Sequence, residues 1–327
     1  MSPGNGHGQL PVEIIDLQFP YVVDLPPALP PERPIWPAIV MFLLTVATTL
    51  AVGAQIATFY ENNQQPFWNV GNPFTMIWQP LAHPKLLLLG IPFSLTLLGI
   101  LFAHEMGHYI ACKIYRIDVS YPMFLPAPNL FGTFGAFIRI RSPFTTRRAL
   151  FDVGIAGPIA GFLVAIPAIA YSIATAKILP DATDGAELLL GAPLLCRMFA
   201  AIFHPHIPVQ WLLPGPIGTA AWFGLFATAL NLLPIWQLDG GHILYSLANE
   251  GHRRVSIALS LVLIGLGIYA WSGWALWGFI LLVLTLRFRH PPVLNRWEEL
   301  DGARRLLAVV ALAIFVLCFT PWPVITP

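Results

Sequence analysis

Charged side chains are scarce in this sequence. Asp, Glu, Lys and Arg make up only 10% of its 327 residues, whereas 57% are hydrophobic, and the net charge is +1. A net charge this small provides no basic field for nucleic acid, so we expect no nucleic-acid partner. Few charges and many apolar residues together are typical of a polytopic membrane protein that lies in a lipid bilayer.

Cysteine is scarce as well. The chain has three cysteines, which are widely separated and show no C-x-x-C spacing. An odd number of scattered cysteines argues against a disulfide framework and against a metal site built from thiolates. Metal ligands are therefore expected among histidine and carboxylate side chains.

Seven apolar stretches are candidates for membrane-spanning helices. They lie at residues 37–60, 86–112, 150–176, 212–235, 255–271, 274–288 and 304–320. The fifth and sixth are short and meet at Ser272-Gly273, so they form either a tight hairpin or one long kinked helix. The predicted fold is an all-α polytopic membrane protein with six to seven transmembrane helices.

The second of these stretches ends in the pentapeptide His104-Glu105-Met106-Gly107-His108, directly after the uncharged residues 86–103. Two imidazoles at positions i and i+4 share one helical face and can both reach a single Zn²⁺, with Glu105 directed toward the metal-bound water. A Glu at membrane depth costs about 3 kcal/mol, so its presence requires a function. Cys112 shares the face of His108 and is a conceivable soft neighbour of the metal, although a small buried hydrophobe is the commoner role.

The basic residues predict the orientation of the chain. With the N-terminus in the cytoplasm and seven spans, 14 of the 17 Lys and Arg residues fall on the cytoplasmic side, and the exceptions are Lys85, Lys177 and Arg197. This is the asymmetry that the positive-inside rule requires. The pentapeptide then lies near the cytoplasmic end of its span, and we predict a multi-pass protein of a bacterial cytoplasmic membrane whose site opens toward the cytoplasm.

Two histidines do not complete a zinc site, because catalytic zinc usually has three protein ligands and a water. Asp239 ends the uncharged stretch 213–238, whose span also runs toward the cytoplasm. We expect Pro234 and the pair Gly240-Gly241 to break the helix there and to let the carboxylate turn toward the metal. A helix cap is the alternative role of Asp239, and His242 is a less favoured competing ligand because it follows the double glycine.

Residues 118–140 are predicted to form a β-hairpin or short sheet beside the motif. The stretch Gly132–Ile140 is rich in β-forming residues with glycine between them, and the prolines upstream argue against a helix. Strand edges at membrane depth must face protein or a water-filled cavity, so this element should line the site. The edge could accept an extended substrate through the candidate substrate-binding residues Gly132, Thr133, Phe134, Gly135 and Ala136.

The chain resembles the site-2 protease family of intramembrane zinc metalloproteases, peptidase family M50. The resemblance rests on H-E-x-x-H and on Asn231-Leu232-Leu233-Pro234-Ile235-Trp236-Gln237-Leu238-Asp239-Gly240-Gly241, both matched in full, and covers about residues 86–250. It implies one Zn²⁺ per chain held by His104, His108 and Asp239, with Glu105 as the catalytic glutamate. It also implies that Asn231 helps to hold substrate or to polarise the scissile carbonyl.

The resulting hypothesis is an intramembrane endopeptidase that cleaves a membrane-anchored protein in or near its transmembrane segment. We expect a proline-rich cytoplasmic tail at 1–36, one transmembrane metalloprotease domain at 37–320 and a C-terminal tail at 321–327. Neither a PDZ domain nor a CBS pair is expected. The alternatives are a membrane metal-ion transporter, because intramembrane His and Asp also mark ion paths, and a non-proteolytic membrane scaffold. The sequence indicates neither the substrate nor an oligomeric state.

Overall fold

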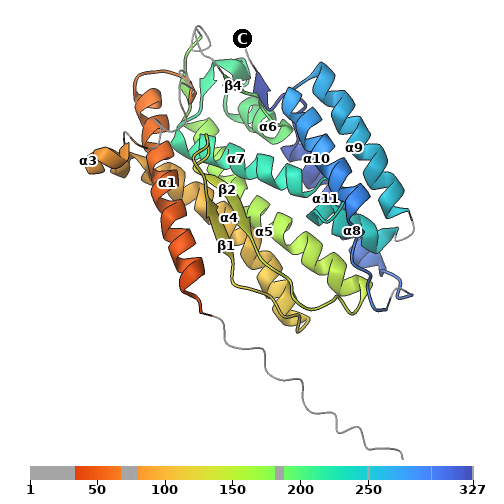
Figure 1. Ribbon diagram of the computed structural model, residues 1–327. Helices are drawn as coiled ribbons and strands as arrows, with labels where there is room; N and C mark the ends of the chain where they lie inside the picture. Colours follow the sequence, from red (N-terminus) through yellow and green to blue (C-terminus); the bar gives the residue numbers. More distant parts are fainter. Residues whose placement is uncertain are drawn as a thin grey trace, which may run out of the picture. The chain divides into compact units, whose positions relative to one another are not determined.

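The computed structural model describes residues 34–67, 78, 80–180, 188–248, 251–295 and 297–325. Helices dominate these residues (Figure 1). The helices are α1 Trp36–Glu61, α3 Pro84–Leu87, η1 Leu88–Gly90, α4 Ile91–Ile114, α5 Arg147–Ala174, α6 Leu194–Phe203, η2 Val209–Trp211, α7 Pro216–Asn231, α8 Asp239–Leu247, α9 His252–Tyr269, α10 Ser272–Arg287 and α11 Gly302–Cys318. The strands are β1 Met123–Pro126, β2 Thr133–Phe137, β3 Lys177–Ile178, β4 Leu189–Leu190, β5 Leu212–Leu213 and β6 Val324–Ile325.

Four helical segments in the described part of the chain are long and apolar enough to cross a membrane. They are Trp36–Glu61, Lys85–Ile114, Arg147–Ala174 and His252–Tyr269. The remaining predicted spans correspond to α7, α10 and α11, which have 16, 16 and 17 residues. A span usually needs about 20 apolar residues, so a total of six to seven spans stays a prediction.

Helices α9 and α10 resolve the ambiguity at Ser272-Gly273. Helix α9 ends at Tyr269 and α10 begins at Ser272, and the two helices lie side by side as a tight hairpin (Figure 1). Gly267 makes this approach possible, because a Cβ on it would lie 2.2 Å from the backbone nitrogen of Ala275. The hairpin is therefore the correct alternative, and one long kinked helix is not.

The predicted β element is confirmed as the antiparallel hairpin of β1 and β2. Its register pairs Met123 with Phe137 and Phe124 with Ala136. The tip is fixed to α1, where the Thr48 hydroxyl donates a hydrogen bond of 2.6 Å to the carbonyl oxygen of Gly132. Gly132 adopts a φ of +74°, and an added Cβ would lie 2.8 Å from the Thr48 carbonyl oxygen, so only glycine fits there.

The helix is interrupted between α7 and α8, as Pro234 predicted. Residues 232–238 form turns that contain Pro234, and α8 then begins at Asp239. The prediction for Gly240-Gly241 is wrong in detail, because both glycines lie inside the first turn of α8 rather than breaking it. They are needed for packing: Cβ atoms on Gly240 and Gly241 would lie 2.1 Å from the Leu232 oxygen and 2.4 Å from the Trp236 oxygen.

Polar contacts attach α11 to the helices of the motif. The Arg304 guanidinium donates to Asp152 on α5 at 2.6 Å and to the Tyr115 hydroxyl, at the end of α4, at 3.2 Å. Tyr115 in turn donates a 2.5 Å hydrogen bond to Asp152. Burial, followed by this bond to Asp152, raises the pKa of the Tyr115 hydroxyl, which therefore stays protonated as a donor.

The two predicted tails differ in what the structure describes. Residues 1–33 of the predicted N-terminal tail lie outside the described residues. In the predicted C-terminal tail, Val324–Ile325 forms β6 and pairs antiparallel with β4, at Leu189–Leu190.

Candidate metal centre

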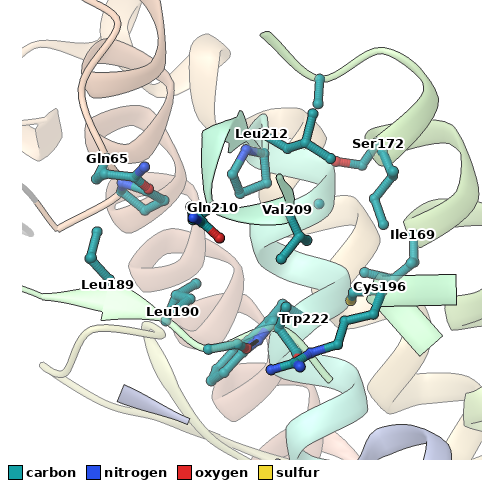
Figure 2. A pocket seen from close by; sticks show the side chains of 18 of the residues that line it. Gln65, Ile169, Ser172, Leu189, Leu190, Cys196, Val209, Gln210, Leu212 and Trp222 are labelled. Carbon is teal, nitrogen blue, oxygen red and sulfur yellow. Dashed lines mark hydrogen bonds between the residues drawn. The ribbon is translucent and has the colours of Figure 1, made fainter. Parts of the chain in front are cut away.

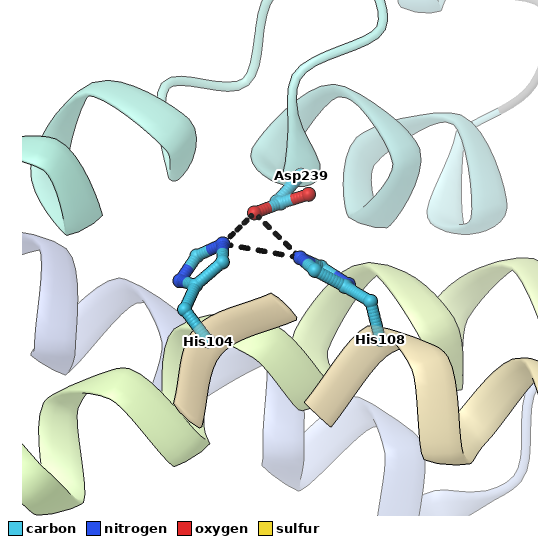
Figure 3. Close-up of side chains that lie close together, drawn as sticks. All are labelled: His104, His108 and Asp239. Atoms are coloured by element: carbon cyan, nitrogen blue, oxygen red, sulfur yellow. Dashed lines mark hydrogen bonds and ion pairs between the residues drawn. The ribbon is translucent and has the colours of Figure 1, made fainter. Parts of the chain in front are cut away.

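His104, His108 and Asp239 meet at one point although Asp239 follows His104 by 135 positions in the sequence (Figure 3). The Nε2 atoms of the two histidines are 3.1 Å apart. Asp239 Oδ2 lies 3.2 Å from His104 Nε2 and 3.3 Å from His108 Nε2. The two imidazoles come from successive turns of α4, and the carboxylate comes from the first residue of α8.

These three atoms fit a zinc ion. Ligand atoms about 2.0–2.1 Å from a tetrahedral zinc are about 3.3 Å from one another, which is close to the observed separations. Asp239 Oδ2 is buried and has no hydrogen-bond partner in the described part of the chain. Three buried lone-pair atoms at this spacing repel one another unless they share a proton or a metal cation. Two imidazoles and one carboxylate are a ligand set that catalytic zinc uses.

A backbone carbonyl sets the tautomer of His108. His108 Nδ1 lies 2.7 Å from the carbonyl oxygen of Val153 on α5. A carbonyl oxygen only accepts, so Nδ1 carries the proton and donates it. Nε2 is then left with a free lone pair directed at the centre, which is the form a metal ligand requires.

Two glycines of α5 make the room for the imidazole rings. A Cβ on Gly157 would lie 2.1 Å from His108 Nε2, and a Cβ on Gly161 would lie 3.2 Å from the Cβ of His104. On the other helix, a Cβ on Gly107 would lie 2.4 Å from the carbonyl oxygen of Ala156. The two helices therefore pack closely here, and the closest of these contacts is with a candidate metal ligand.

Glu105 is buried beside the centre but does not belong to the ligand group. Its carboxylate has the backbone of Ile138, just after β2, as a hydrogen-bond partner. The hairpin therefore lies directly against this glutamate, as the sequence predicted for an element lining the site.

Asn231 is the last residue of α7, and its Nδ2 lies 3.3 Å from His104 Nε2. Among the candidate substrate-binding residues, Thr133 is buried and its hydroxyl donates a 2.7 Å hydrogen bond to the Leu125 carbonyl oxygen, so it holds the hairpin together. Phe134 is 73% exposed and is free to contact another molecule.

The two alternative ligands lie outside the group. Cys112 is fully buried among apolar residues that include Ile117 and Val119. His242 Nδ1 lies 2.8 Å from His290 Nε2 instead of facing the centre. Sequence reasoning missed Val153 and Ile138, because both act through backbone atoms and no side-chain pattern marks them.

An apolar cavity of about 240 Å³ lies elsewhere in the molecule (Figure 2). Ile169, Cys196, Leu212 and Trp222 are among its lining residues, and no candidate metal ligand lines it. Since it contains none of the polar groups described above, the candidate site is the centre formed by α4 and α8.

Gly157→Ala tests the fit between α5 and the imidazoles. The added methyl group occupies the position of the His108 ring, so we expect zinc affinity to fall roughly 10- to 100-fold. Chelator competition on the purified protein measures this change. Gly99→Ala on α4 is the control, because nothing lies within 4 Å of a Cβ at that position. Wild-type zinc affinity in Gly157→Ala would contradict the proposed packing.

Comparison with known proteins agrees with this geometry. The sequence model of Peptidase family M50 matches residues 92–269. Curated relatives include "Probable zinc metalloprotease EGY1, chloroplastic" of Arabidopsis thaliana, which is 29% identical over 303 residues, or 87% of this chain and 52% of the relative. The Oryza sativa subsp. japonica protein of the same name is 26% identical over 87% of this chain and 50% of its own length. "Probable zinc metalloprotease EGY2, chloroplastic" of Arabidopsis thaliana is 26% identical over 72% of this chain and 42% of its own length.

This chain spans about half the length of these curated relatives. They are plant chloroplast proteins, so the comparison does not support the predicted bacterial cytoplasmic membrane, whereas the apolar helices support a membrane protein. The family match covers more than half of the chain and includes H-E-x-x-H, Asn231 and Asp239. The chain belongs to peptidase family M50.

Proposed function

We propose that this chain is an intramembrane zinc endopeptidase that hydrolyses a peptide bond in or near the transmembrane segment of a membrane-anchored protein. The observation that carries the proposal is the convergence of His104, His108 and Asp239 beside Glu105, which is buried and outside the ligand group. We further propose one zinc per chain and a single membrane domain over residues 37–320. Each relative named above is described as a probable zinc metalloprotease, which supports the same assignment.

Zinc held by the three ligands would polarise the scissile carbonyl and make a bound water acidic. Glu105 accepts the proton of the attacking water and returns it to the leaving amine. Its place on α4 suits this role, because the residue after His104 lies about 100° around the helix and thus outside the ligand face. The backbone of Ile138 is a hydrogen-bond partner of this carboxylate.

Asn231 is proposed to orient the substrate carbonyl. Its Nδ2 lies 3.3 Å from His104 Nε2, so its amide stands at the edge of the ligand group. An amide N–H in that place can donate to a carbonyl oxygen as negative charge develops on it.

The β2 edge is proposed to bind the unwound substrate as an added strand. Arg139 N–H and C=O both bond to Ser120, at 2.8 and 3.0 Å, and so face the β1 side of the hairpin. Successive residues of an extended strand direct their backbone groups to opposite edges. Ile138 and Ala136 therefore face the other edge, in agreement with the contact between Ile138 and Glu105. A substrate strand on that edge lies next to the general base.

Glu105→Gln should separate a peptidase from a metal transporter. The amide cannot accept a proton, so we expect cleavage of a candidate transmembrane substrate to fall by roughly two or more orders of magnitude. Zinc content should stay near one per chain, whereas His108→Ala should lose zinc. If Glu105→Gln cleaves the substrate as fast as the wild type, the proposed mechanism is ruled out. Zinc flux across proteoliposomes without any peptidase activity would favour the transporter.

Ala136→Pro tests strand addition. Proline has no N–H, so the variant should cleave substrate at least about tenfold more slowly while it retains zinc, if that N–H bonds to the substrate. Ala136→Val is the matched control because it keeps the backbone donor. A proline variant that turns over substrate as fast as the valine variant would rule out this edge.

The orientation is also a proposal, with the site opening toward the cytoplasm. Thr145 and Thr175 are exposed and flank α5, and the three native cysteines are buried. We expect Thr175→Cys to react with an impermeant maleimide in intact cells and Thr145→Cys to react only after permeabilisation. Reaction of Thr145→Cys alone in intact cells would reverse the orientation.

A further inference from the structure

A second cavity, of about 320 Å³, has no candidate metal ligand among its lining residues. It is bounded by the first turn of α9, the end of α10 and the segment Phe288–His290 that follows α10. The proposed peptidase mechanism uses none of its lining residues.

Buried polar atoms without partners are concentrated around this cavity. The described part of the chain has seven such side-chain atoms, and three belong to lining residues: Trp236 Nε1, His252 Nε2 and Thr285 Oγ1. His252 is 4% exposed and Thr285 is 3% exposed. A buried polar group without a hydrogen bond costs about 1–3 kcal/mol, so three around one cavity indicate a missing partner.

Two positively charged side chains also line this cavity. Arg253 and Arg289 line the cavity, and neither has a carboxylate partner in the described part of the chain. Helix α9 begins here with His252 and Arg253, with no acidic residue in its first turn and no side-chain cap. Because the helix dipole already places positive charge at an N-terminus, these basic residues are unfavourable unless an anion neutralises them.

The available hydrogen-bonding groups fit an anion with several oxygens. The Trp236 indole is a donor only, the Thr285 hydroxyl can donate, and two guanidinium groups present paired N–H bonds. His252 Nε2 can donate as an imidazolium or accept from a protonated oxygen. A volume of about 320 Å³ is much larger than a monatomic ion, and the aromatic wall of Tyr245 and Phe288 leaves room for an organic group.

We propose that this cavity binds a phosphate group, held by Arg253 and Arg289 and by the buried donors of Trp236 and Thr285. The group is either the headgroup of an anionic phospholipid or a soluble phosphate. The position at the first turn of a candidate spanning helix is compatible with both sources, because it places the cavity at the end of an apolar segment. The proposal does not depend on the peptidase activity.

The first experiment is a titration of the purified full chain with inorganic phosphate in neutral detergent, followed by thermal unfolding. Phosphate should raise the Tm of the wild type, while chloride at matched ionic strength should not. The double variant Arg253→Gln/Arg289→Gln should need at least about tenfold more phosphate for the same shift. Arg254→Gln is the matched control, since the neighbouring Arg254 is exposed and does not line the cavity.

Thr285→Val tests the buried donor, because valine keeps the shape and lacks the hydroxyl. It should also weaken the phosphate effect. Equal stabilisation by chloride, or equal loss in Arg254→Gln and in the double variant, would overturn the proposal and indicate general charge screening. The same titration in nanodiscs distinguishes the two sources. If phosphatidylglycerol removes the rise in Tm caused by phosphate and phosphatidylcholine does not, the ligand is a lipid headgroup. If the rise in Tm is the same in both lipids, the ligand is a soluble phosphate.

Discussion

The rest of the site depends on the close contact between α4 and α5. Helix α5 presents Gly154, Gly157 and Gly161 to the motif helix and to α8, and at Gly157 the imidazole of His108 takes the place of a side chain. The same contact brings the Val153 carbonyl to His108 Nδ1 and thereby orients the lone pair of Nε2. A larger residue at Gly157 would separate the helices or displace the ring, so packing and ligand geometry are one requirement here.

The third ligand, Asp239, follows an interruption between two helices and does not lie within one continuous helix. Helix α7 ends at Asn231, the turns around Pro234 redirect the backbone, and α8 starts at Asp239. One interruption thus brings an amide to His104 and a carboxylate to both His104 and His108. Because three buried lone-pair atoms repel one another without a cation, we infer that metal binding and the packing of α8 stabilise each other.

The groups proposed to act on substrate lie on different elements around this centre. Glu105 comes from α4, Asn231 from the end of α7, and the Ile138 backbone amide from the chain after β2. The hairpin is tied to α1 through Thr48 and Gly132, so its edge has a fixed position relative to α4. The proposed phosphate cavity borders α8: Tyr245 of that helix lines it, and His242 of the same helix meets His290 on the cavity wall.

The sequence by itself determined the helical membrane class, the hairpin after the motif, and the candidate residues His104, His108, Glu105 and Asp239, because each has a local signature in spacing, hydrophobicity or proline and glycine. It favoured Asp239 over His242 without excluding His242, and it left open a hairpin or a kinked helix at Ser272-Gly273. Those choices follow from long-range packing. The Val153 carbonyl, the Ile138 amide and the cavity at α9 were also decided only by the tertiary structure, since every residue has the same backbone groups and only the fold determines which of them meet.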